Sequence, residues 1–285
     1  MKLPPFDYAC PTTLPEAIQL LVARDGDAKA IAGGQSLVPM LAFRLAQPTL
    51  LVDLRKLPDL RGIRISAKGV TLGAMVRWRD IEDDERLDTA HPLLKAAIAH
   101  VAHYQVRNRG TVGGSLAHAD PAAEMPGIAM TCDAEIAVVG KSGARVIQAA
   151  DFFQGALTTA LTPDEIIVEL RLPAWPAGRR WGFEEFARRR GDFAMAAAAV
   201  FYDQDESGKA RNAHVGVIGV ADRPLRLPTV EDVLNGRAID PTIIAKAEAA
   251  TSAAVDPQDD IHASAAYRRA LVGTLVERAL KRAAA

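Results

Sequence analysis

The sequence predicts an α+β protein of two parts: a mixed N-terminal region, then a smaller region of antiparallel strands and helices. Three observations support this. Short apolar runs of strand length alternate with helical spacing in the first part, segment 173–180 concentrates Pro and Gly, and strand-like runs precede helical ones beyond it. We therefore predict one domain over residues 1–175, with two α/β subdomains at about 1–56 and 57–175, and a second domain over 178–285.

The first helix is predicted over residues 13–26 from its start signals. Thr13 is a suitable N-cap, Pro15 suits the first turn, and Glu16 stands three residues after Thr13. This spacing is typical of a capping box, so we expect the helix to begin directly after Thr13.

A strand, turn, helix and second strand follow. Residues 28–32 (AKAIA) and 49–54 (TLLVDL) are apolar runs of strand length, and 39–47 (PMLAFRLAQ) has helical composition. Between the first strand and this helix stand Gly33, Gly34, Gln35 and Ser36. The pattern predicts a strand–turn–helix–strand unit whose first turn is rich in glycine.

The rest of the first part predicts two hairpins, a helix and a closing strand. Alternating runs predict hairpins over 62–75 and 134–153. Apolar residues at helical spacing predict one helix over 91–105. Segment 163–173 is a strand that should stop at Pro173.

The second part predicts three strands in succession and then three helices. The last helix has an apolar stripe at a helical period. The predicted strands are 182–190, 194–203 and 210–221, and the helices are at about 229–235, 241–254 and 264–282.

Composition excludes several classes of function. The chain of 285 residues is 49% hydrophobic and 24% charged with a formal net charge of −1, which gives no reason to expect nucleic acid or an anionic membrane as a partner. No window reaches the length of a membrane span, and the N-terminus lacks the pattern of a secretion signal, so we expect a cytoplasmic protein.

Cysteine and histidine usage argues against a metal centre on this chain. The two cysteines, Cys10 and Cys132, cannot form a disulfide scaffold or hold an iron–sulfur cluster alone. His100 and His103 would lie on one side of the predicted helix, but no acidic third ligand accompanies them. We predict no metal site and single out no catalytic residue.

The glycine turn after the first strand is suited to binding an anion. Gly33 and Gly34 permit positive φ and a close backbone approach, and their N–H groups can surround phosphate oxygens. Gln35 and Ser36 add neutral donors. The phrase is neither a P-loop nor a G-x-G-x-x-G fingerprint, and a Gly-Gly pair after a strand is often only a tight turn.

A second phrase, residues 109–124 (RGTVGGSLAHADPAAE), strengthens the interpretation. It again places adjacent glycines beside hydroxyls and adds Asp120 and Glu124, whose carboxylates can accept hydrogen bonds from ribose hydroxyls. Two such phrases suit a dinucleotide. The structural alternative stays open: Asp120 precedes a proline in a loop, and Glu124 suits the start of a helix.

These two phrases resemble the FAD-binding signatures of the flavoprotein (medium) subunits of molybdenum hydroxylases. That family includes the medium subunit of carbon monoxide dehydrogenase and the FAD domain of xanthine dehydrogenase. The similarity runs along nearly the whole chain, through the opening 5–21, the strand 164–173 and the segment 186–200 (FARRRGDFAMAAAAV).

The resemblance implies a fold and a role. The fold is a vanillyl-alcohol-oxidase-type FAD-binding domain followed by a distinct C-terminal domain. The role is that of an FAD-carrying electron-transfer subunit that receives electrons from [2Fe–2S] clusters on a small partner subunit and passes them to an external acceptor. A large partner subunit with molybdopterin would perform the hydroxylation, in a dimer of heterotrimers.

The resemblance also implies site residues. Around the diphosphate it places Lys29, Ile31, Ala32, Gly33, Gly34, Gln35, Ser36 and Leu37, and in the second loop Thr111, Val112, Gly113, Gly114 and Ser115. Glu124 supplies a carboxylate for ribose or ribityl hydroxyls, and Asp120 is counted with the cofactor-binding residues. Ile167 packs near the adenine, and Phe193 with Asp192 lies near the isoalloxazine ring. Some members have Lys at the position of Glu184, a residue near the flavin, so acceptor preference cannot be transferred from them.

Two alternatives come from other classes. A stand-alone FAD-dependent oxidase would need its own acid–base residues over the flavin, and the sequence singles out no such His or Tyr group. A non-redox module that binds a phosphorylated metabolite would keep the glycine turns but would not need Phe193 or a C-terminal domain.

Overall fold

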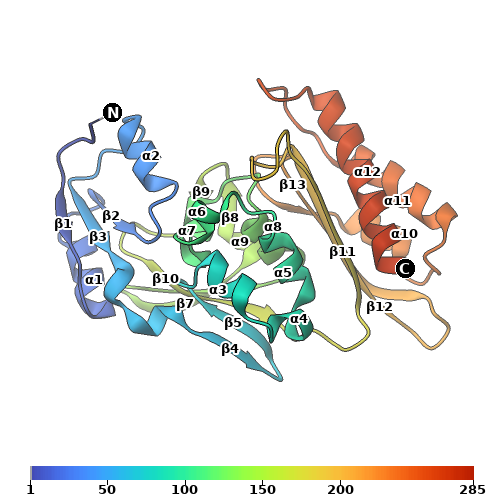
Figure 1. The fold of residues 1–285 in the computed structure, drawn as a ribbon, viewed down its shortest axis with the longest axis horizontal. Helices are drawn as coiled ribbons and strands as arrows, with labels where there is room; N and C mark the ends of the chain where they lie inside the picture. The colour runs from blue at the N-terminus through green and yellow to red at the C-terminus, as the bar shows by residue number, and fades with distance from the viewer. Residues whose placement is uncertain (1) are drawn as a thin grey trace.

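The protein contains three main β-sheets, each with its own helices, arranged in a row (Figure 1). The structure is a computed structural model that describes residues 2–285. A small three-stranded sheet lies at one end, a five-stranded sheet covered by helices lies in the middle, and a four-stranded sheet backed by three helices lies at the other end. The α+β class predicted from the sequence is confirmed.

The first sheet is parallel, with strand order β1-β3-β2. Helix α2 joins β2 to β3, as the strand–turn–helix–strand pattern predicts. This helix ends at Ala42 rather than at residue 47, because Arg44 has a φ of 63° that an α-helix cannot accommodate. The elements are β1 (Asp7–Ala9), α1 (Leu14–Val22), β2 (Ala28–Ile31), α2 (Leu37–Ala42) and β3 (Leu50–Asp53).

Helix α1 begins where its sequence signals place it. The Thr13 hydroxyl accepts a hydrogen bond from the backbone N–H of Glu16 at 3.3 Å. The Glu16 carboxylate accepts in return from the N–H of Thr12 at 3.0 Å, one residue before the position that a capping box requires.

The middle sheet is antiparallel, with order β4-β5-β10-β6-β7, and both predicted hairpins belong to it. The strands are β4 (Ile63–Ser66), β5 (Gly69–Gly73), β6 (Glu135–Gly140), β7 (Gly143–Gln148) and β10 (Ile166–Pro173). Short 3₁₀ turns at Leu54–Lys56 and Pro58–Arg61 lead into it, and β8 (Phe153–Gly155) and β9 (Thr158–Thr159) form a separate small hairpin.

Short helices cover this sheet (Figure 1). They are α3 (Trp78–Asp83), α4 (Leu87–Ala90), α5 (Pro92–Ile98), α6 (Tyr104–Arg107), α7 (Val112–His118), α8 (Glu124–Thr131) and α9 (Ala149–Phe152). The prediction of one helix over 91–105 is wrong, since α5 ends at Ile98 and Ala102 turns the chain with a φ of 42°. His100 and His103 therefore do not share one side of a helix.

The last sheet is antiparallel, with order β11-β12-β13-β14. The predicted strand 182–190 in fact begins at Arg180 and ends at Phe186, which leaves Arg188, Arg189 and Arg190 exposed in a loop. The short strand β14 was not predicted, whereas the three helices were. The elements are β11 (Arg180–Phe186), β12 (Ala196–Gln204), β13 (Ala210–Ile218), β14 (Leu225–Arg226), α10 (Pro228–Leu234), α11 (Pro241–Ala254) and α12 (Ala265–Ala284).

Both faces of this last sheet are buried, which explains its alanine-rich strand β12. Alternate residues Ala196, Ala198 and Val200 pack with α10–α12 in one core. Ala197, Ala199 and Phe201 pack in the large central core that the middle sheet and its helices share. The small side chains let helices approach the sheet from both sides.

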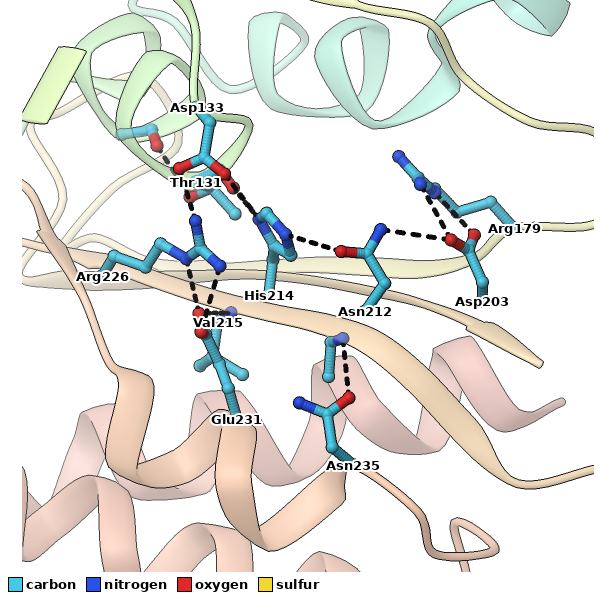
Figure 2. Close-up of polar contacts among 12 residues, drawn as sticks. Thr131, Asp133, Arg179, Asp203, Asn212, His214, Val215, Arg226, Glu231 and Asn235 are labelled. Atoms are coloured by element: carbon cyan, nitrogen blue, oxygen red, sulfur yellow. Dashed lines mark hydrogen bonds and ion pairs between the residues drawn. The ribbon is translucent and has the colours of Figure 1, made fainter. Parts of the chain in front are cut away.

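A polar network joins the end of α8 to the last sheet (Figure 2). The His214 ring donates from Nδ1 to the backbone carbonyl of Thr131 at 2.8 Å. Arg226 forms ion pairs with both Asp133 and Glu231. The N-terminal and C-terminal parts of the chain are thus fixed to each other by charge and hydrogen bonds as well as by the shared core.

None of the helices within residues 2–285 combines the length and the apolar character that crossing a membrane requires.

Candidate functional site

A cavity of about 570 Å³ lies where the first sheet, the central helices and a loop from the last sheet meet. It collects nearly every residue that the sequence proposes for the site. The predicted residues that line it are Lys29, Ile31, Ala32, Gly33, Gly34, Gln35, Ser36, Leu37, Thr111, Gly113, Gly114, Ser115, Asp120, Glu124, Ile167, Asp192 and Phe193. Val112 is the exception: it lies fully buried in the central core.

The turn after β2 presents a run of backbone donors. None of the N–H groups of residues 33–37 has a hydrogen-bond acceptor among the residues that the structure describes. Gly34 adopts a φ of 72°, and the Gln35 side chain fixes the turn by donating to the Gly33 carbonyl at 3.0 Å. The Ser36 hydroxyl does not cap α2. Consecutive unpaired N–H groups that line a cavity suit an anionic ligand such as a diphosphate.

The two glycine phrases pack directly against each other. A Cβ atom on Gly33 would lie 2.1 Å from the carbonyl oxygen of Arg109 and 2.9 Å from the Cα atom of Gly110. No side chain fits in that space. The second phrase therefore supports the first turn, and this contact explains the glycine at position 33. The glycines of the second phrase have other close neighbours: Trp78 for Gly110, Ala74 for Gly113 and Thr111 for Gly114.

The second phrase uses most of its own N–H groups within the chain. Gly113 donates to the carbonyl of Ala74 at 2.8 Å, and Gly114 donates to the Thr111 hydroxyl at 3.2 Å. Val112 and Ser115 also donate to backbone carbonyls. Unlike the first turn, this loop does not offer a run of free donors, although its glycines and hydroxyls form part of the cavity wall.

Two acidic side chains follow the second phrase. Asp120 accepts a hydrogen bond from the N–H of Ala122 at 2.9 Å, which shapes the loop. Glu124 is the first residue of α8 and is only 8% exposed. Burial raises the pKa of the Glu124 carboxyl to about 7, and the charge of Asp120 adds to the rise. A carboxyl group is thus held at the cavity wall with little solvent around it.

The loop between β11 and β12 supplies one side of the cavity mouth. Gly191 has a φ of 89°, and a Cβ atom there would lie 2.4 Å from Nδ1 of His103. This contact holds Asp192 and Phe193 at the cavity, and the Phe193 ring is 65% exposed. Ile167, another residue of the cavity lining, lies at a β-bulge of β10 and is almost fully buried.

Glu184, which the resemblance places near the flavin, is not among the residues that line the cavity. It forms an ion pair with Arg282 of α12 at 2.8 Å. Successive side chains of a strand point to opposite faces, so Glu185 is the residue of this pair that faces the central helices.

Several cavity residues were missed at the level of sequence. His118 stands inside the second phrase and was within reach of prediction. Gly191 also had a signal, because Gly-Asp between two strands indicates a turn. A further part of the lining carries no motif, and only the fold brings it to the glycine turns: Leu157, Thr158, Thr159, Leu161, Thr162, Pro163, Glu165 and Ile166.

Comparisons with known proteins agree with this geometry. The family described as the FAD binding domain in molybdopterin dehydrogenase matches residues 4–175, and the CO dehydrogenase flavoprotein C-terminal domain matches residues 181–283. The chain belongs to the FAD-binding medium subunits of the molybdenum hydroxylase family. It is an oxidoreductase subunit, and FAD is its cofactor.

Relatives of this medium subunit match it from end to end. The nicotine 6-hydroxylase medium subunit of Paenarthrobacter nicotinovorans is 40% identical over 100% of this chain and 99% of its own length. The carbon monoxide dehydrogenase medium chain of Afipia carboxidovorans is 37% identical, over 98% of this chain and 97% of its own.

Solved structures of the family have the same fold. In carbon monoxide dehydrogenase from Hydrogenophaga pseudoflava, the matching chain superimposes with a TM-score of 0.96 at 37% identity, covering 99% of this chain and 98% of that one. In quinoline 2-oxidoreductase from Pseudomonas putida 86 the TM-score is 0.94 at 40% identity, covering 100% and 98%.

The residues of the cavity fit FAD. The free N–H groups of the first turn match an anionic diphosphate, the close contact of the two phrases leaves no room for side chains there, and Lys29 adds a positive charge with no ion-pair partner among residues 2–285. In this medium subunit FAD supplies reversible uptake of electrons, and the chain supplies binding and orientation.

Proposed function

We propose that this chain is the electron-transfer subunit of a heteromeric molybdenum hydroxylase. It would receive electrons from [2Fe–2S] clusters of a small partner subunit and deliver them through FAD to an external acceptor. A large subunit with molybdopterin would carry the hydroxylation, and two such heterotrimers would associate. The observation that carries this proposal is the agreement between a preformed cofactor cavity and end-to-end similarity to medium subunits of such enzymes.

We also propose how the cavity residues divide the cofactor between them. The N–H groups of residues 33–37 would hold the diphosphate, with Lys29 nearby to offset its charge. Glu124 would accept from a ribose or ribityl hydroxyl. Ile167 would lie against the adenine, and Phe193 with Asp192 would lie near the isoalloxazine ring, at the open side of the cavity.

The cysteines support a partner as the source of electrons. Cys132 is buried, and burial raises the pKa of its thiol to about 12, so it is not available as a thiolate ligand. Cys10 remains the other free cysteine. Because a [2Fe–2S] cluster needs four protein ligands, any cluster that serves this flavin lies on another chain.

The proposal is tested on the complex purified with its natural partners. Visible spectra would be recorded under anaerobic conditions before and after addition of nicotine, quinoline, caffeine or carbon monoxide, the compounds in the names of relatives. We expect flavin and iron–sulfur bands that bleach together on addition of a substrate.

A matched complex containing Gly33→Ala sharpens the test. Its iron–sulfur bands should still bleach, while reduction of an external acceptor should fall in proportion to the flavin that the weakened site no longer holds. A chain that holds FAD without an iron–sulfur partner and is reduced directly by a small molecule would be a stand-alone FAD-dependent oxidase. A colourless chain that also fails to bind added FAD would overturn both.

A further inference from the structure

A buried arginine of the last helix contacts two segments that lead to the cavity. Arg268 lies near the start of α12 and is only 7% exposed. One terminal nitrogen of its guanidinium group, Nη1, donates to the carbonyl of Met195 at 2.6 Å and to the carbonyl of Gly219 at 2.7 Å. The other, Nη2, donates to the Asp260 carboxylate at 2.6 Å. A buried cation that donates to backbone carbonyls of two separate segments joins those segments to each other.

The Met195 carbonyl belongs to the loop at the open side of the cavity. Met195 stands directly before β12, two residues after Phe193, and its N–H donates to the carbonyl of Phe186 at 2.8 Å. This hydrogen bond closes the base of the loop that carries Asp192 and Phe193 to the cavity. Arg268 fixes the same base through the Met195 carbonyl.

The Gly219 carbonyl belongs to a segment that holds the second glycine phrase. Gly219 stands directly after β13, and its N–H donates to the carbonyl of Pro121 at 2.9 Å. Pro121 lies between Asp120 and Glu124, and both of these residues line the cavity. Arg268 therefore reaches a second cavity loop through one intervening residue, Gly219.

The two anchored segments are in direct contact, and Arg268 is their shared donor. Gly219 has a φ of 75°, and a Cβ atom there would lie 2.8 Å from the Met195 carbonyl oxygen. Neither the Met195 nor the Gly219 carbonyl has another hydrogen-bond donor within residues 2–285. Loss of the guanidinium group would leave both carbonyls unpaired at the place where the segments meet, which costs free energy unless the segments move apart.

The Asp260 carboxylate holds the guanidinium group in this place. Its other oxygen accepts from the N–H groups of His262 and Ala263 at 2.8 Å and 2.9 Å, which fixes the loop before α12. Desolvation opposes ionisation, but the hydrogen bonds from Ala263, Arg268 and His262 lower the pKa of the Asp260 carboxyl to about 2. The ion pair is therefore intact at neutral pH.

We propose that Arg268 is a positioning residue of the cofactor site: it holds the loop that carries Phe193 and the loop that carries Glu124 at a fixed separation, so that both are in place when FAD binds. This inference rests on the places proposed for Phe193 and Glu124 beside FAD. Arg268 does not line the cavity. It acts through the Met195 and Gly219 carbonyls, and it makes the C-terminal helix part of the support of the cofactor.

The test measures the Kd of FAD for the whole chain, freed of flavin, by fluorescence titration, together with thermal unfolding of the same samples. In Arg268→Ala the two carbonyls lose their shared donor, and FAD has to bring both loops back into place as it binds. We expect the Kd to rise by roughly 10- to 150-fold, the range of a hydrogen bond to a charged group. The absorption bands of bound flavin should also shift, because Phe193 is displaced.

Arg269→Ala is the matched control. Arg269 is the next residue of the same helix and makes the same kinds of contact, with the Val255 carbonyl at 3.3 Å and the Asp256 carboxylate at 3.1 Å. These partners lie between α11 and α12 and not in a cavity loop. This variant should lower the unfolding temperature and leave both the Kd and the flavin bands unchanged.

Rescue by guanidinium chloride gives a readout that a merely structural role would not move. The guanidinium ion has the shape and charge of the group that Arg268→Ala removes. At concentrations well below those that unfold the protein, it should lower the Kd of this variant toward the wild-type value. Sodium chloride at the same concentration controls for ionic strength and should not restore binding. Guanidinium should leave the Kd of Arg269→Ala as it is in sodium chloride.

The inference is overturned if Arg268→Ala binds FAD as tightly as the wild type, if both variants weaken binding equally, or if guanidinium restores only the unfolding temperature. Should Arg268→Ala not fold, Arg268→Lys replaces it: the charge stays, but the planar fork that serves three acceptors is lost. It should bind FAD more weakly than the wild type, and equal affinity would overturn the inference. A wild-type chain that does not bind FAD would refute the assignment of the cavity itself, whereas unchanged variants of a chain that binds FAD refute only the role of Arg268.

Discussion

Replacing Gly33 with Ala would test whether close packing of the two glycine turns holds the FAD site. The added Cβ atom would lie 2.1 Å from the Arg109 carbonyl oxygen, and this distance must lengthen to at least 3.0 Å. Such overpacking costs about 1–3 kcal/mol. If the displaced turn no longer aims its N–H groups at the diphosphate, the same free energy appears as a Kd for FAD weaker by roughly 5- to 150-fold.

The assay is a fluorescence titration of the apoprotein with FAD, together with thermal unfolding of the same samples. Gly236→Ala is the control: it has a φ of 74°, no atom within 4 Å of an added Cβ, and no place in the cavity lining. Its backbone strain of about 1–2 kcal/mol should lower the unfolding temperature without changing the Kd. The reasoning is refuted if Gly33→Ala binds FAD like the wild type, or if both variants lose affinity equally.

Three further predictions follow from the contacts described. Phe193→Ser should change the free energy of unfolding by no more than about 0.5 kcal/mol, because the ring is 65% exposed. The same change should shift the absorption bands of bound flavin, and unchanged bands would show that Phe193 does not lie at the flavin. Burial lowers the pKa of His91 from 6.5 to about 3, so between these pH values the unfolded chain binds more protons than the folded one. The free energy of unfolding, measured by urea denaturation, should therefore fall as the pH is lowered from 6.5 to 3, by at most about 1.4 kcal/mol per pH unit. His91→Asn, which keeps an acceptor for the N–H of Leu94, should flatten this dependence, and an unchanged slope would assign it elsewhere. Gly216→Ala would place a Cβ atom 1.8 Å from Oγ1 of Thr131 and should destabilise the chain by about 1–3 kcal/mol in the same denaturation assay; a wild-type midpoint would contradict the packing of α8 on β13.

Elements whose signals are local were predictable from the sequence. The helix Pro241–Ala254 matches its prediction residue for residue, and both hairpins of the middle sheet form where their alternating patterns place them. The errors occur where the chain adopts a conformation that its own residues do not favour. Ala102 and Arg44 take positive φ values and end helical patterns that local sequence would continue, because tertiary packing selects those turns.

The site shows the same division. The first glycine turn was predictable, since two glycines directly after an apolar strand favour an anion-binding turn once a second such phrase is present. The face of β11 to which the Glu184 side chain points could not be predicted, because a one-residue shift in the register of a strand exchanges its two faces. Sequence places both Glu184 and Glu185 on β11, but only pairing with β12 shows which one faces the cavity side.

Helix α8 connects the cofactor cavity to the C-terminal part of the chain. Its first residue, Glu124, lines the cavity, and its last, Thr131, accepts from His214 of β13. Between them a Cβ atom on Gly127 would lie 2.6 Å from the Ile218 side chain, so α8 packs closely against β13 at this point. A helix of this length spans only about 12 Å and behaves as a rigid rod. A change at Gly216 that pushes Thr131 away should therefore displace Glu124 as well, and weaken FAD binding from a position that does not contact the cavity.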